Sequence, residues 1–139
     1  MRKASPTQAA ARTLGCGWVA ASATEAGLVY TSCGDETKER ALESVHGEGL
    51  PEGPLAVRAA EAVAAYLREG QPVPELPLDL AHLPEFTAAV LSAAARIPFG
   101  ATRTYSELAA EVGKPGAARA VGQIMAHNPL APVVPCHRV

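Results

Sequence analysis

The sequence predicts an α+β protein, with a small N-terminal lobe of β-sheet and helix followed by a mainly helical lobe that contains a helix-turn-helix. Three observations predict this fold. Two short apolar runs with aromatic residues flank a glycine turn within residues 17–32. From residue 55 onward, apolar residues recur at three- and four-residue spacing. Residues 71–77 hold three prolines, which is typical of an extended connection, so we predict lobes at residues 1–80 and 81–139.

The composition is that of a globular protein. The chain has 139 residues, of which 48% are hydrophobic, and no apolar run approaches the roughly 20 residues that cross a bilayer. The N-terminus lacks the apolar core of a signal peptide. We therefore expect a cytoplasmic protein with no membrane partner.

The charges are unevenly distributed. Residues 1–100 hold 8 Lys or Arg against 12 Asp or Glu, whereas residues 101–139 hold 4 against 2. A basic C-terminal part is what a nucleic-acid-binding lobe would show, but a chance scatter of solvated charges explains so mild an asymmetry equally well.

The three cysteines, Cys16, Cys33 and Cys136, include no Cys-x-x-Cys pair. This argues against a disulfide scaffold and against a zinc knuckle, so we expect reduced thiols. Whether Cys16, Cys33 and His82 hold a metal ion stays open, because nothing in their spacing defines three ligands. No metal site is predicted.

The N-terminal lobe begins with a predicted β-hairpin whose strands are Gly17–Ser22 and Leu28–Ser32. The first dozen residues show no convincing period, and we assign them no structure or function. The charged residues 35–48 predict a helix, and a loop rich in glycine and proline follows. Residues 55–68 predict a second helix, whose apolar stripe is expected to cover the sheet: Val57, Ala60, Val63, Ala64 and Leu67.

The C-terminal lobe begins with a helix that starts at Leu83-Pro84-Glu85 and ends near residues 97–100. Its predicted buried residues are Phe86, Ala89, Val90 and Ala93. Thr104 and Glu107 then form a capping-box pattern, which predicts a short helix from Tyr105. A turn at residues 113–116 leads to a second helix, in which the following residues are expected to face inward: Ala117, Ala120, Val121 and Ile124.

The outer side of that second helix is predicted to carry small residues rather than long polar ones. Ala118, Gly122 and Met125 share one side, with Arg119 and Gln123 nearby. Small residues and one arginine suit close contact with a DNA minor groove, which needs few base-reading side chains. The same small residues equally suit helix packing, so the pattern alone leaves both interpretations open.

The end of the sequence brings a cysteine next to a histidine, Cys136 and His137. A thiol needs a nearby base or cation to react at neutral pH, and His137 is a candidate base. Neighbouring side chains on an extended chain point to opposite faces, so direct contact would need a turn or a bridging water. A buried structural cysteine beside a surface histidine is the alternative.

The sequence around this pair resembles that of the O6-alkylguanine-DNA alkyltransferases, also called methylated-DNA–protein-cysteine methyltransferases. The resemblance runs from about Phe86 to Val139 and fades in the N-terminal half. The segments that carry it are Phe99-Gly100, Thr104-Tyr105, Leu108-Ala109, residues 113–122 with Ala-Ala-Arg-Ala-Val-Gly, Asn128-Pro129 and Pro-Cys-His-Arg-Val at residues 135–139.

The resemblance implies DNA repair by direct transfer of an alkyl group from O6-alkylguanine in double-stranded DNA to Cys136, once per molecule and without a cofactor. It implies that Tyr105 contacts the flipped nucleotide and that Arg119 enters the base stack. The helix residues implied to contact DNA are Ala118, Gly122, Gln123 and Met125. His137 would take part in catalysis, and Asn128 and Arg138 would brace the site. Asn128, just past the second helix and before Pro129, also fits an ordinary C-cap, and the two roles are compatible. We expect a monomer.

The resemblance also implies a further C-terminal segment, with a glycine-rich substrate loop and a glutamate that completes a Cys-water-His-Glu relay. The sequence ends at Val139, so we expect a C-terminally truncated lobe with weakened transfer. An alternative function is therefore binding of alkylation-damaged DNA with little or no transfer.

Overall fold

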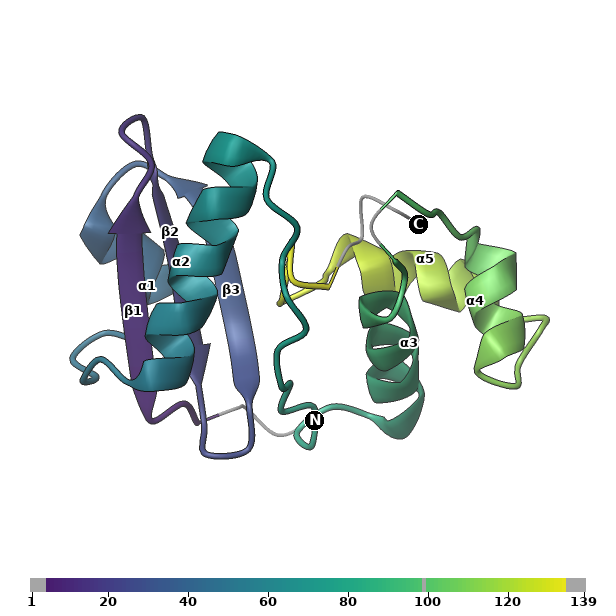
Figure 1. Ribbon diagram of the computed structural model, residues 1–139. Coiled ribbons are helices and arrows are strands. Elements are labelled where there is room, and N and C mark those ends of the chain that lie inside the picture. The colour runs from purple at the N-terminus through teal and green to yellow at the C-terminus, as the bar shows by residue number, and fades with distance from the viewer. Residues whose placement is uncertain (1–4, 99, 135–139) are drawn as a thin grey trace. The chain divides into compact units, whose positions relative to one another are not determined.

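The computed structural model describes residues 5–98 and 100–134. The chain forms two compact units, which divide between Asp79 and Leu80. The N-terminal unit contains β1 (Gln8–Thr13), β2 (Trp18–Ala23), β3 (Leu28–Asp35), α1 (Lys38–Ser44) and α2 (Pro54–Glu69). The C-terminal unit contains α3 (Glu85–Ala95), α4 (Tyr105–Glu111) and α5 (Ala118–Ala126) (Figure 1).

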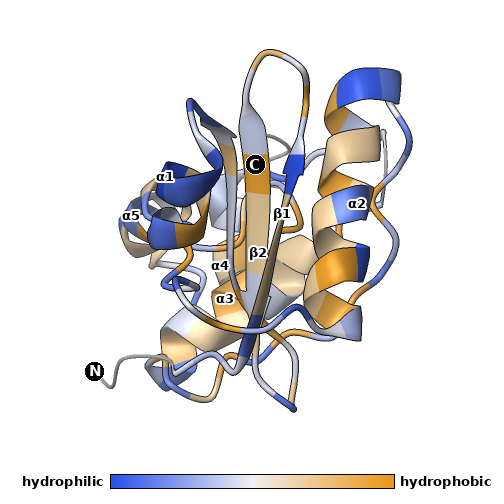
Figure 2. Ribbon diagram, turned by 90° about the vertical axis from the view of Figure 1, so that its left-hand side faces the viewer, coloured by the Kyte–Doolittle hydropathy of each residue, from blue (hydrophilic) through white to orange (hydrophobic). Residues whose placement is uncertain are grey.

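The N-terminal unit is a three-stranded antiparallel sheet in the order β1-β2-β3. The views in Figures 1 and 2 agree that α1 and α2 cover opposite faces of this sheet. Both helices pack against all three strands. The predicted α+β class and the predicted hairpin of β2 and β3 are therefore confirmed.

The first strand, β1, was not predicted. Its sequence is rich in alanine, which has a low intrinsic preference for strands, so local pattern alone gave no signal. Pairing with β2 decides its structure, since all six residues from Gln8 to Thr13 lie opposite a β2 residue. Ala9, Ala10 and Ala11 are buried. The expectation of an unstructured first dozen residues is therefore wrong for this segment.

The helices α1 and α2 occupy the predicted segments, but the buried stripe of α2 differs from the predicted one. Val57 is only half-buried and Leu67 is 43% exposed. The buried residues of α2 are instead Ala56, Ala59, Ala60, Val63 and Ala64. The strands are themselves rich in buried alanine, and small side chains on both surfaces allow a helix to pack closely on a sheet.

The end of the proline-rich connection pairs with the start of β3 and is the last segment of the N-terminal unit. Leu78 forms a parallel bridge with Leu28, and the Asp79 amide donates to the Leu28 carbonyl at 2.8 Å. Gly27 permits this close approach, because a Cβ at that position would lie 2.6 Å from the Leu78 carbonyl carbon. Thr24 Oγ1 donates to Asp79 Oδ2 at 2.5 Å, which ties the hairpin turn to the end of the connection.

The three helices of the C-terminal unit pack on one another. The buried residues of α3 are Val90, Leu91, Ala93 and Ala94, whereas the predicted Phe86 and Ala89 are half-buried. Leu108 and Ala109 of α4 and Val121 and Met125 of α5 complete this core, together with Leu130 and Val134. Ala120, predicted to face inward, is exposed. Packing among three helices, rather than one amphipathic stripe on each helix, decides which residues are buried here.

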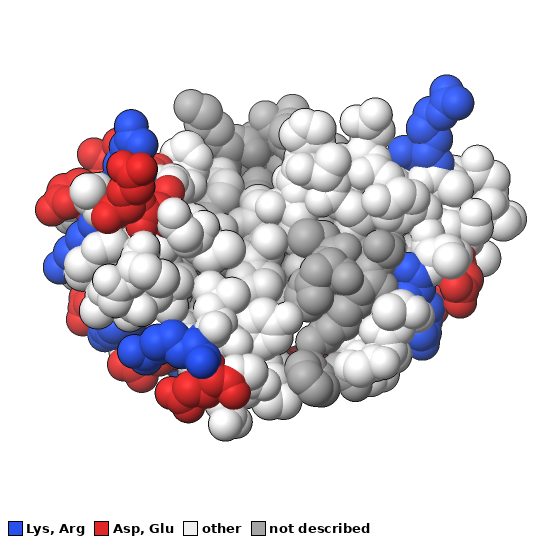
Figure 3. Space-filling model, turned by 90° about the horizontal axis from the view of Figure 1, so that it is seen from above, with Lys and Arg blue, Asp and Glu red and all other residues white. Residues whose placement is uncertain are grey.

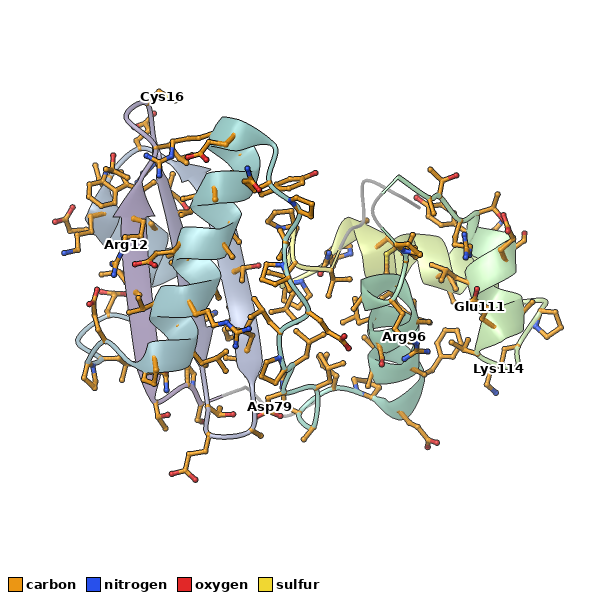
Figure 4. All side chains as sticks on the ribbon, in the orientation of Figure 1. Arg12, Cys16, Asp79, Arg96, Glu111 and Lys114 are labelled. Atoms are coloured by element: carbon orange, nitrogen blue, oxygen red, sulfur yellow. The ribbon has the colours of Figure 1, made fainter. Side chains whose placement is uncertain are left out.

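The described residues contain neither a membrane-spanning helix nor a cluster of metal ligands. Within residues 5–98 and 100–134, no helix is both long enough and apolar enough to cross a membrane. The same part of the chain has no group of three His, Cys, Asp or Glu side chains that could hold a metal ion. Cys16 and Cys33, considered above as ligands with His82, are both exposed, and Cys16 lies at the β1–β2 turn (Figure 4).

Candidate functional site

The helix-turn-helix starts at a complete capping box, as the sequence predicted. The Glu107 amide donates to Thr104 Oγ1 at 3.0 Å, and the Thr104 amide donates to Glu107 Oε1 at 3.1 Å. These bonds satisfy two amides that the first turn of α4 leaves without helical partners. The hydrogen bond that the Thr104 amide donates to the carboxylate is the main cause of a lowered pKa of Glu107. The backbone of Tyr105, the first residue of α4, is thereby held in place.

The turn between α4 and α5 is closed by backbone hydrogen bonds. Gly113 has a φ of +83°, which a residue with a side chain rarely adopts. This conformation lets the Lys114 amide donate to the Ala109 carbonyl at 2.9 Å, and the Ala117 amide then donates to the Lys114 carbonyl at 3.0 Å. Figure 4 labels Glu111 and Lys114 at this corner. The turn therefore determines where α5 begins.

The exposed side of α5 carries Arg119 and Gln123, two of the residues predicted to contact DNA. Ala118 and Gly122 are half-buried, at the border of this surface. Met125 is only 5% exposed and belongs to the core, so the expectation that it shares the outer surface is wrong. Its long apolar side chain instead fills space between the helices.

Sequence reasoning missed two exposed residues on this surface, Ala126 and His127. His127 is the C-cap of α5, and its Nδ1 lies 3.0 Å from the Gln123 carbonyl oxygen. Steps of four and seven residues from Arg119 lead to Gln123 and Ala126, so helical spacing counted from the arginine would have found this row. Counting from Ala118 led instead to Met125.

Tyr105 and Gly122 are in direct contact. A Cβ placed on Gly122 would lie 3.1 Å from Tyr105 Cε2 and 3.3 Å from Cδ2, so the edge of the ring rests on the backbone of α5. Tyr105 is nevertheless 43% exposed. The fold therefore brings together two residues that the sequence had assigned separately to the site, one from each helix of the motif.

Asn128 follows α5 and bonds to both ends of the next segment. Its Oδ1 accepts from the Leu130 amide at 2.9 Å, and its Nδ2 donates to the Val134 carbonyl at 2.8 Å. The Val134 amide also donates to the Leu130 carbonyl at 2.8 Å. This segment is thus a closed turn, and the chain leaves it at Val134, two residues before Cys136. The predicted residues Cys136, His137 and Arg138 lie outside the described residues.

Both units contain ion pairs between exposed or half-exposed side chains. On the face drawn in Figure 3, acidic and basic side chains are closely mixed on the N-terminal unit. Arg12 of β1, for example, lies 2.9 Å from Glu52 and 3.6 Å from Glu61, and the hydrogen bond to Glu52 raises the pKa of the arginine. Arg103 and Glu111 of the C-terminal unit form a 3.4 Å pair, whereas Arg119 extends from an exposed position on α5.

Comparison with known proteins shows what this chain is similar to. Residues 85–139 match the family described as 6-O-methylguanine DNA methyltransferase, DNA binding domain. The methylated-DNA–protein-cysteine methyltransferase of Mycolicibacterium paratuberculosis is 47% identical over 92 residues, which are 66% of this chain and 55% of that protein. The Mus musculus protein of the same name is 42% identical over 113 residues, 76% of this chain and 53% of that protein. The chain spans about half the length of these curated relatives.

Solved structures extend the similarity to the N-terminal unit. A variant of the Mycobacterium tuberculosis O6-methylguanine methyltransferase is 32% identical, with a TM-score of 0.71, over 95% of this chain and 77% of that one. Mycobacterium tuberculosis OGT in complex with DNA is 30% identical, with a TM-score of 0.70 and the same two coverages. The shared fold over nearly the whole chain, together with the match of its helix-turn-helix and C-terminal segment, shows that this chain belongs to the O6-methylguanine-DNA methyltransferase family.

Proposed function

We propose that this protein repairs double-stranded DNA by moving an alkyl group from O6 of guanine to Cys136. The sulfur of the thiolate attacks the alkyl carbon as the bond from that carbon to O6 breaks. The electron pair of the broken bond stays on the base, which takes up a proton and leaves as ordinary guanine. The product is a thioether on the protein, so each molecule acts once, and neither a cofactor nor a metal ion is needed.

The exposed side of α5 supports the binding step of this proposal. O6 of a stacked and paired guanine is out of reach of a protein thiol, so the nucleotide has to rotate out of the duplex. Arg119 extends from the exposed side of a helix whose neighbouring residues are small, as a close approach to the minor groove requires. Arg119 is then the side chain that occupies the gap in the base stack, and Tyr105 contacts the rotated nucleotide.

The acceptor end of the site depends on three residues outside the described part of the chain. His137 takes the proton from the Cys136 thiol, directly or through a water, and so raises the population of thiolate at neutral pH. Arg138 and Asn128 brace the segment. Because these residues follow the Asn128 turn at once, the turn would limit where the sulfur can lie relative to α5.

The observation that carries the proposal is the pair of hydrogen bonds that join the Asn128 side chain to the turn ending at Val134, one donated to Val134 and one accepted from Leu130. A side chain that makes two bonds to one short segment holds that segment in a single geometry. A fixed segment suits a thiol that has to meet one atom of a base, because reacting groups need a defined geometry. The same unit carries both this turn and the exposed side of α5.

Peptide mapping tests the proposal. The chain is incubated with duplex DNA containing O6-methylguanine, and the methylated peptide is identified by mass spectrometry. We expect one methyl group on Cys136, its loss in Cys136→Ala, and its persistence in Cys16→Ala and Cys33→Ala, which are the matched controls. Methylation mainly on Cys16 or Cys33, or undiminished transfer in Cys136→Ala, would overturn it.

A second candidate function is binding of alkylated DNA without transfer. The exposed side of α5 favours it, because base rotation by Arg119 and Tyr105 requires no acceptor thiol. Intact mass after incubation separates the two functions. Selective binding of the methylated duplex with an unchanged protein mass would support the second, and a mass increase of one methyl group would support the first.

A further inference from the structure

We propose that Gly122 is a positioning residue for Tyr105, and that its lack of a side chain sets where the tyrosine ring meets the rotated nucleotide. The inference rests on the proposed function and deepens it. It assigns Gly122 a second purpose besides a close approach of α5 to DNA, namely to form the surface against which the ring rests.

The contact geometry is the first argument. Tyr105 is the first residue of α4, and the Thr104–Glu107 capping box fixes its backbone. Its ring carbons Cε2, Cδ2 and Cζ lie 3.1, 3.3 and 3.7 Å from the position that a Cβ of Gly122 would occupy. The side chain can still rotate about its Cα–Cβ and Cβ–Cγ bonds, and the backbone of α5 at Gly122 limits how far the ring can move toward it. Since 43% of Tyr105 is exposed, a surface of the residue stays available to a ligand.

Helix energetics provide the second argument. Gly122 is the middle residue of the nine-residue helix α5. Its φ is not positive, so the backbone conformation there does not require glycine. Glycine in a helix interior costs about 1 kcal/mol relative to alanine. What the position requires is therefore the absence of a Cβ, and the atoms that would lie nearest to that Cβ all belong to the Tyr105 ring.

The expected effect of a methyl group at this position follows from these distances. A Cβ 3.1 Å from a ring carbon is too close, so the ring has to move by a few tenths of an ångström. Tyr105 is partly exposed and has room to do so without disturbing the core. Gly122→Ala should therefore fold at least as stably as the parent, while Tyr105 is displaced from the place where it meets the nucleotide.

The experiment compares Gly122→Ala with Gly116→Ala, a matched control in the turn before α5, where an added Cβ would meet nothing within 4 Å. Single-turnover transfer from O6-methylguanine duplex and affinity for that duplex are measured for both. We expect Gly122→Ala to lower the transfer rate about tenfold, since small misplacements of positioning groups have effects of this order. Gly116→Ala should stay within about twofold of the parent.

A double-mutant cycle with Tyr105→Ala separates an effect through the ring from a clash of the new methyl with DNA. If Gly122 acts through Tyr105, Gly122→Ala adds no further loss once the ring is gone. The cycle is measured by affinity for the damaged duplex as well as by transfer rate. A Tyr105→Ala variant that transfers too slowly to measure can therefore still be compared by its affinity.

The outcomes distinguish the inference from the proposed function. If the parent transfers no methyl group to Cys136, the proposed function fails, and the inference fails with it. If the parent is active and Gly122→Ala matches it, or if the losses in the cycle are additive, only the inference is overturned. A loss in Gly122→Ala that disappears in the Tyr105→Ala background supports it.

Discussion

Asn128 Nδ2 donates a hydrogen bond to the carbonyl oxygen of Val134 at 2.8 Å. The two residues are six positions apart, and the amide oxygen of Asn128 accepts from the Leu130 backbone within the same turn. Val134 and Leu130 are both fully buried. Asn128 therefore links the end of α5 to a buried turn. The chain continues from Val134, the last residue of this turn, toward Cys136.

Replacing Asn128 tests the importance of this turn. Asn128→Ala removes both bonds and leaves the Leu130 amide and the Val134 carbonyl without these partners, which costs about 1–3 kcal/mol of stability for each buried group left unsatisfied. Asn128→Asp keeps the acceptor for Leu130 but has no donor for Val134. We expect both variants to transfer more slowly than the parent, with thermal unfolding and single-turnover transfer as the measurements. Full transfer activity in Asn128→Asp would contradict a role for the bond to Val134.

Replacing Arg119 should weaken damage-selective binding without affecting the fold. The side chain is exposed, and surface substitutions change stability by about 0.5 kcal/mol or less. Aromatic side chains that stack on bases contribute about 1–3 kcal/mol per base, and we expect the same range for the planar guanidinium of Arg119 inserted in the stack. Arg119→Ala should therefore lower affinity for O6-methylguanine duplex between about fivefold and 150-fold.

The matched control for Arg119 is Arg58→Ala, which removes an exposed arginine from α2 in the N-terminal unit. It loses the same charge but should retain damage-selective binding, as measured by titration of labelled duplex at one salt concentration. Equal losses of affinity in the two variants would mean that Arg119 acts only as a general positive charge. A large loss of thermal stability in Arg119→Ala would make it a structural residue.

The capping box predicts a defined pH dependence of stability. The hydrogen bond that the Thr104 amide donates to the Glu107 carboxylate lowers the pKa of Glu107 below the ordinary value of 4.5, so the charged form stabilises the folded state. This contribution is complete above pH 4.5 and is lost as pH falls through the lowered pKa. Glu107→Gln keeps an acceptor but has no charge. The parent should therefore exceed Glu107→Gln in stability above pH 4.5, and the gap should close in acid. Thermal unfolding across pH measures this, and a gap independent of pH would count against it.

A buried hydroxyl in the N-terminal unit is expected to be important for stability. Ser22 is fully buried on β2, and its Oγ donates to the carbonyl of Val45, the C-cap of α1, at 2.7 Å. Ser22→Ala leaves that carbonyl without this donor, which should lower the free energy of unfolding by about 1–3 kcal/mol. Ser44→Ala is the control, since the bonds of Ser44 are exposed and a surface change is worth about 0.5 kcal/mol or less. Urea unfolding that gave equal losses would refute the prediction.

Features that depend on neighbours in the chain were predictable. The capping box of Thr104 and Glu107 lies within four residues, and its geometry is the same in any helix, so the start of α4 was predicted to the residue. The hairpin of β2 and β3 was predictable for the same reason, because aromatic and branched residues surround a glycine turn. The motif around Cys136 needed no structure, since it identifies the family by its residues.

Features that depend on distant partners were not predictable. Local pattern gave no strand at Gln8–Thr13, because alanine has little preference for a strand until β2 provides the hydrogen bonds. Leu67 and Met125 were assigned to the wrong surfaces, since hydrophobicity shows that a residue can be buried but not which neighbour is near enough to bury it.

The sequence by itself determined the family, the order of the helices and the residues that carry the proposed chemistry, because each of these is a matter of residue type and short spacing. Only the tertiary structure decided that the Tyr105 ring rests on Gly122, and that Asn128 closes the turn ending at Val134. Both contacts arise where separate segments meet. Distances between such segments are set by the packing of the whole unit, and no local pattern contains them.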